Sequence, residues 1–180
     1  MREVVCSTAR LDLVVPTMED CRALATMWGD PETMRYIGDG SGWTREKVEE
    51  RIKRAIERQQ DRGMTFWTVI ERSSGEVIGQ GGLVPIEFNG DEIELGYRLG
   101  KAHWGNGYAS EIARASAAYG FEELGFEALV GVCNAENLAS RRVLIKAGFV
   151  EDGESEVYYG VPTVVHRMRR NSKSQNECVR

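Results

Sequence analysis

The sequence lacks any apolar run that approaches the roughly 20 residues of a membrane-spanning helix. Its amino terminus, MREVVCSTAR, has an apolar stretch too short for the core of a signal peptide, and Cys6 has no such core before it to suggest lipidation. We therefore expect a cytoplasmic protein that has no membrane partner.

Cysteine and histidine are also sparse. Cys6, Cys21, Cys133 and Cys178 form no CxxC pair, and the two histidines, at positions 103 and 166, are far apart. We expect no metal site. Four cysteines could form disulfides, but a chain of this length and apolar content does not need them, so reduced thiols are favoured.

What the chain does have is an ordinary globular composition. Its 180 residues are 42% hydrophobic and 28% charged, which argues against a disordered, fibrous or membrane protein. We expect one domain over residues 1–170 and a polar tail over 171–180. The net charge of −5 disfavours a nucleic-acid partner and suits a cationic small molecule or a basic peptide.

Hydrophobic periodicity predicts an α/β chain. Alternating or continuously apolar patterns predict strands over 11–15, 66–71, 77–84, 93–99 and 129–133, and a closing hairpin over 149–158 and 161–168. Helical spacing predicts helices from Asp20 to the Asp30-Pro31 pair, after Thr44, from Tyr108 to Leu124, and over 137–146. Asn89-Gly90 is a turn signal before the strand 93–99.

The segment between the strand 93–99 and the helix at Tyr108 is rich in glycine. Unpaired N–H groups at a helix start attract anions, and glycine lets a phosphate approach the backbone, so Trp104 to Ala109 could cradle a phosphate. The alternative is a tight turn with no ligand. A Walker loop is excluded because Asn106 and Gly107 occupy the positions of its Lys and Ser/Thr. A dinucleotide fingerprint is disfavoured by Ser110 and by the absence of an acidic residue near Asn134.

Three ordered motifs resemble the GNAT acetyltransferase superfamily, and within it the RimJ/RimL-like branch of ribosomal-protein N-terminal acetyltransferases. They are Glu94-Leu95-Gly96-Tyr97, then Trp104-Gly105-Asn106-Gly107-Tyr108-Ala109, then Asn137-Leu138-Ala139-Ser140 followed by Ala147-Gly148-Phe149. The resemblance implies an α/β (α+β) fold with a mixed, mostly antiparallel sheet, splayed after its fourth strand and flanked by about four helices. It also implies acetyl-CoA as cosubstrate.

The resemblance assigns cofactor-binding roles. The pyrophosphate would bind the backbone of Trp104, Gly105, Asn106, Gly107, Tyr108 and Ala109, with Trp104 departing from the family's Gln or Arg. The pantetheine arm would pair with the backbone of Tyr97, Arg98 and Leu99, one N–H of which would polarise the thioester carbonyl, and Asn137 would bond the cofactor arm. The cations that could meet the adenosine phosphates, or could be solvated surface, are Arg98, Lys101, Arg141, Arg142 and Lys146.

Two residues are expected to move protons. Glu94 would be the base, directly or through water; alternatively, Glu92 and Glu94 share one strand face and are both solvated. Many relatives carry a tyrosine acid seven residues after the motif asparagine, but Leu144 stands there. Ser140 is the hydroxyl that remains to protonate the thiolate, or it only packs or bonds within its helix.

The resulting functional hypothesis is an N-acetyltransferase that moves acetyl directly from acetyl-CoA to a primary amine of a small molecule or a protein N-terminus. A homodimer is one assembly that this hypothesis allows. The alternative is a catalytically inactive CoA-binding sensor or interaction module. A dinucleotide-dependent oxidoreductase is a third hypothesis, which Ser110 and Asn134 weaken.

Overall fold

A computed structural model describes residues 2–86 and 92–170. The predicted turn at Asn89-Gly90, the predicted tail 171–180 and Cys178 lie outside the described residues. The described part holds a single eight-stranded sheet. Its strands are β1 (Val4–Ser7), β2 (Leu11–Val14), β3 (Phe66–Glu71), β4 (Val77–Pro85), β5 (Ile93–Leu99), β6 (Ala128–Asn134), β7 (Val150–Ser155) and β8 (Thr163–Arg169).

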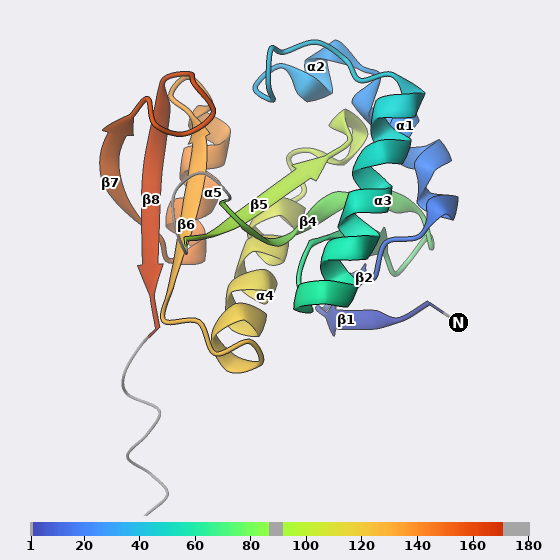
Figure 1. Cartoon of the computed structure of the whole chain (residues 1–180), viewed down its shortest axis with the longest axis horizontal. Coiled ribbons are helices and arrows are strands. Elements are labelled where there is room, and N and C mark those ends of the chain that lie inside the picture. Colours follow the sequence, from blue (N-terminus) through green and yellow to red (C-terminus); the bar gives the residue numbers. More distant parts are fainter. Residues whose placement is uncertain (1, 87–91, 171–180) are drawn as a thin grey trace, which may run out of the picture.

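The strands follow the order β1-β2-β3-β4-β5-β6-β8-β7, and only the β5–β6 pair is parallel. This confirms the expected mixed, mostly antiparallel α/β fold. Figure 1 shows α1, α2 and α3 gathered on one side of the molecule, and β6, β7, β8 and α5 on the other. β5 crosses between these two groups. It is the fifth strand of the structure but the fourth that the sequence predicts, since β1 has no predicted counterpart.

The helices begin and end at residues suited to those positions. They are α1 (Cys21–Trp28), α2 (Pro31–Met34), α3 (Arg45–Arg62), α4 (Tyr108–Glu122) and α5 (Leu138–Ala147), with 3-10 turns at Met18–Asp20 and Lys101–His103. The Thr44 hydroxyl accepts from the N–H of Lys47 at the start of α3, and Gly63 ends that helix with φ +66°.

The structure corrects three of the predictions of secondary structure. Asp30-Pro31 begins the short helix α2, because the Asp30 carboxylate accepts from the N–H groups of Glu32 and Thr33. β1 was not predicted, since this short strand is partly exposed along its length and shows no clear alternation. The closing strands are shorter than the predicted ranges, and residues 156–162 form the loop between them.

Side chains of β5 alternate between two helical layers. Leu95 and Leu99 belong to the main core together with Ile112 of α4, whereas the guanidinium of Arg98 lies over the ring of Trp28, in α1. The close approach of α4 depends on β4, where a Cβ on Gly81 would overlap Ile112. α4 and α1 therefore cover opposite faces of β5.

Candidate active site

β5 and β6 diverge from a single point. β5 pairs with β4 along its whole length, from Ile93 to Leu99, but with β6 only where Glu94 meets Val130. Beyond Glu94 the structure gives β5 no further partner on β6, so the edge of β5 from Leu95 onward is open toward the gap. An extended, amide-bearing molecule can pair with such an edge as an added strand does.

The start of α4 provides open backbone N–H groups. Gly107 is the N-cap with φ +80°, and no side chain caps the helix. Gly105 has φ +78°, and a Cβ built on it would meet no atom within 4 Å. Left-handed backbone at two glycines, uncapped N–H groups and the positive end of the helix dipole together fit an anion such as a pyrophosphate.

Side chains around this loop fix its shape. Trp104 Nε1 donates to the Leu99 carbonyl at 2.8 Å, and Asn106 Nδ2 donates to the carbonyls of His103 and Trp104, both at 3.3 Å. Arg10 Nη1 donates to the Asn106 carbonyl at 3.0 Å, while its other nitrogens bind Glu111 of α4. No local sequence pattern points to Arg10, because its partners Asn106 and Glu111 lie 96 and 101 positions later.

Glu94 lies at the point where the strands diverge. It is 7% exposed, and burial raises the pKa of its carboxyl from 4.5 to about 7. The hydroxyl of Tyr159, in the β7–β8 loop, donates to its Oε2. The solvated alternative is therefore wrong for Glu94, and Glu92 is also engaged, accepting from Tyr158 at 2.6 Å and from Arg167.

Tyr97, Ser140 and Asn137 come together across the gap. The Tyr97 hydroxyl lies 2.9 Å from Ser140 Oγ, and burial raises the pKa of that phenol well above its ordinary value. Asn137 Oδ1 accepts from the N–H of Ser140 at 3.1 Å and so caps α5. This cap engages the amide oxygen of Asn137.

Residues 10–150 match the model of the acetyltransferase (GNAT) domain. This chain belongs to the GNAT acetyltransferases. It is 30% identical to an uncharacterized N-acetyltransferase, YoaA, of Bacillus subtilis over 86% of this chain and 87% of the relative.

Solved structures share the fold. An acetyltransferase from Agrobacterium tumefaciens has a TM-score of 0.78 at 26% identity, covering 92% of this chain and 94% of the other. An acetyl transferase from Salmonella typhimurium that modifies the N-terminal serine of ribosomal protein L7/L12 has a TM-score of 0.79 at 15% identity, covering 94% of this chain and 100% of the other. Membership of the family makes this chain an acyl-CoA-dependent N-acyltransferase whose acetyl donor is acetyl-CoA.

The cations expected around the cofactor of this acetyltransferase do not form one cluster. Lys101 pairs with Glu32, and Arg141 pairs with Glu151 at 2.9 Å. The side chain of Arg98 lies on the α1 face of β5, away from α4. Arg142 and Lys146 are exposed on α5.

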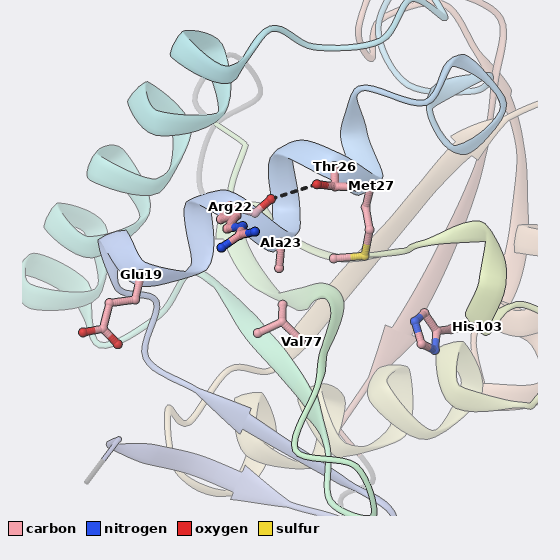
Figure 2. A pocket seen from close by; sticks show the side chains of 7 residues that line it. All are labelled: Glu19, Arg22, Ala23, Thr26, Met27, Val77 and His103. Carbon is pink, nitrogen blue, oxygen red and sulfur yellow. Dashed lines mark hydrogen bonds between the residues drawn. The ribbon is translucent and has the colours of Figure 1, made fainter.

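One hollow in the described part of the acetyltransferase lies apart from the predicted site residues. It has a volume of about 420 Å³, and Figure 2 shows its lining on one side of α1: Glu19, Arg22, Ala23, Thr26, Met27, Val77 and His103. None of these is a predicted site residue. Residues 2–86 and 92–170 contain no group of acidic, histidine and cysteine side chains that could hold a metal, and no helix that could span a membrane.

Proposed function

We propose that this acetyltransferase transfers acetyl directly to a primary amine, with the β5–β6 gap as the cofactor cleft and Glu94 as the base. The observation that carries the proposal is the position of Glu94. It is buried at the point where β5 leaves β6, with a carboxyl pKa of about 7. A base poised near neutral pH can accept the proton of an ammonium group and still be regenerated in solvent.

The residues of the cleft suit the parts of the cosubstrate. The N–H groups of the loop from Trp104 to Ala109 would bind the pyrophosphate, and the open edge of β5 at Tyr97, Arg98 and Leu99 would bind the pantetheine arm. Asn137 Nδ2 would donate to the same arm. When bound, acetyl-CoA supplies a thioester whose carbon forms a bond to the amine nitrogen while its bond to sulfur breaks.

Proton transfers complete the reaction. Glu94 takes the proton that the amine loses, directly or through a water molecule. A main-chain N–H of residues 97–99 polarises the thioester carbonyl. Ser140 protonates the departing sulfur, and its contact with the Tyr97 hydroxyl relays a replacement proton that comes from solvent, so that both hydroxyls end protonated.

We propose the RimJ/RimL-like branch for this chain, supported by the motif order and by the fold shared with the enzyme that modifies ribosomal protein L7/L12. Its acceptor would be a protein N-terminus or a small-molecule amine.

The test measures release of free thiol from acetyl-CoA in the presence of a panel of peptide N-termini and small primary amines. Thiol release that depends on an amine, with the acetylamide as product, supports transfer. CoA binding by calorimetry without thiol release for any amine would contradict it and favour a binding module.

A further inference from the structure

The side chain of Arg98 occupies an unusual position on the face of β5 that it shares with Glu94. Its guanidinium carbon lies 4.7 Å from the centre of the Trp28 ring and 4.4 Å from that of Trp43. Trp28 ends α1, and Trp43 lies just before α3. These contacts stabilise a cation through the ring faces, but they satisfy none of its N–H donors.

Two of the three nitrogens of this guanidinium group are unpaired. Nε and Nη1 of Arg98 are buried without a hydrogen-bond partner, and within residues 2–86 and 92–170 no carboxylate forms an ion pair with Arg98. Gln80, directly opposite on β4, has a buried and equally unpartnered Nε2. Buried donors are nearly always satisfied, and an unpaired buried charge is costly, so this pair of side chains is suited to an acceptor from outside the chain.

The surroundings are positively charged. Lys47 Nζ lies 5.0 Å and the Arg51 guanidinium 5.3 Å from the centre of the Trp43 ring. Burial, and then the charge of Arg51, lower the pKa of Arg98 to about 9. An anion placed beside Arg98 would offset both the cost of burying its charge and the repulsion from Arg51.

This anion site is separate from the cofactor cradle. The uncapped start of α4 belongs to the helix that packs on the other face of β5, where Leu95 and Leu99 meet Ile112. Glu94 is on the face of Arg98, four residues earlier, at a distance of about 13 Å along the strand. A molecule whose amine is at Glu94 can therefore extend to Arg98 on the acceptor side.

We propose that the amine acceptor carries an anionic oxygen group, a carboxylate or a phosphate, that binds Arg98 and Gln80 beside Trp28 and Trp43. This proposal rests on the proposed function, because Glu94 marks the place of the amine. The site makes Arg98 a determinant of acceptor specificity, and it favours acceptors with about 13 Å between the amine and the anionic group, which is the spacing of Glu94 and Arg98 along the strand.

The first test compares kcat/KM for a graded series of ω-amino carboxylates, their primary amides and ω-amino alkyl phosphates. We expect the preferred anionic acceptor to exceed its uncharged partner by roughly 10- to 100-fold, as expected for hydrogen bonds to a charged group. Arg98→Met, which keeps an apolar chain against the indoles, should bring that ratio close to one. If the carboxylate and phosphate series give different kcat/KM ratios, the series with the higher ratio identifies the anionic group that the site prefers.

Two variants control for charge and folding. Arg54→Gln removes a cation of α3 that pairs with Glu50, and it should leave the ratio and the activity unchanged. Arg51→Gln retains Arg98 and should lower the ratio by only a few fold. A ratio near one in the unmodified enzyme, or a ratio that Arg98→Met does not alter, would overturn the proposal and leave Arg98 a purely structural partner of the indoles.

A binding measurement distinguishes failure of this proposal from failure of the proposed function. Calorimetry with N-acetylated ω-amino carboxylates, which have no reactive amine, should give an affinity roughly 10-fold weaker in Arg98→Met than in the unmodified protein. That result would stand even if no amine accepted acetyl. Active transfer with no carboxylate or phosphate dependence would instead retain the proposed function and exclude the anion site.

Discussion

The hydroxyl of Tyr159 donates a hydrogen bond to the buried carboxylate of Glu94 and links the β7–β8 loop to β5. Tyr159 has φ +60°, and it is the only non-glycine residue with a positive φ in the described ranges. Burial and the charge of Glu94 raise the pKa of this phenol, so it keeps its proton and remains a donor. The loop thereby holds a donor against the proposed base.

Replacing Glu94 tests the base directly. Glu94→Gln should lower kcat/KM by about 10²–10⁴-fold while leaving CoA affinity unchanged, because the amide preserves shape but cannot accept the proton. Steady-state kinetics and calorimetry measure the two effects. Glu92→Gln is the matched control, since that carboxylate binds Tyr158 and Arg167 instead. Near-normal rates in Glu94→Gln would leave solvent as the proton acceptor.

The pH dependence of the rate tests the role of Tyr159. With a Glu94 pKa of about 7, kcat/KM should rise through neutral pH to a plateau as the carboxylate forms. The Tyr159 hydrogen bond lowers this pKa, so Tyr159→Phe should move the rising limb to higher pH. A limb at the same pH in Tyr159→Phe would show that the hydrogen bond does not act on the titrating group.

Local signals were sufficient for much of the fold. The glycine loop, the strong apolar stripe of α4 and the alternation in β5 gave these elements almost correct bounds, because each is set by its own residues. β1 was missed because an exposed edge strand shows little alternation. Asp30-Pro31 was misassigned because a cap and a stop use the same residue types.

The site was only partly predictable for a different reason. The motifs predict Glu94, Ser140 and the loop as site residues, a prediction that concerns function; their hydrogen-bond partners come from distant elements. Tyr159, Arg10 and Trp43 reach the site only after the chain folds. A sequence pattern with period two can place Arg98 on one face of β5. It cannot show that the indole rings of Trp28 and Trp43 pack against Arg98 on that face.

A side chain at Gly107 should prevent binding of acetyl-CoA. In Gly107→Val, the atom nearest to the new Cβ would be Arg10 Nη2, at 3.7 Å, so the side chain would project into the space proposed for the phosphate. The backbone at this position has φ +80°, which also strains a valine. Calorimetry should detect a loss of CoA affinity. Gly125→Val places the same strain at φ +71°, with no atom within 4 Å, at the far end of α4. CoA affinity that is equal in the two folded variants would exclude the cradle.

The paired hydroxyls of Tyr97 and Ser140 should act on the chemical step. Ser140→Ala should lower kcat by roughly 10- to 100-fold with CoA affinity nearly intact, because protonation of a leaving thiolate occurs mainly in the transition state. If Tyr97 replaces the proton through Ser140, the double variant with Tyr97→Phe should be little slower than Ser140→Ala alone. A change confined to CoA affinity would make Ser140 a cofactor contact.

Burial of Glu94 should also appear in the pH dependence of stability. Its carboxyl pKa rises from 4.5 in the unfolded chain to about 7 in the folded protein, so between these values the folded state keeps a proton that the unfolded state releases. The contribution of Glu94 to stability is therefore greatest below pH 4.5 and is lost as the pH rises through 7, a change on the order of 3 kcal/mol.

Urea unfolding at a series of pH values measures this change as the difference between the unmodified protein and Glu94→Gln. Other carboxylates titrate alike in both proteins, so their contributions cancel in the difference. The glutamine variant carries no charge at position 94 at any pH, and it should gain stability relative to the unmodified protein as the pH rises from 4.5 to 7. Parallel stability curves across that window would mean that the carboxyl of Glu94 titrates near its ordinary pKa and is not held in the desolvated position that the proposed base requires.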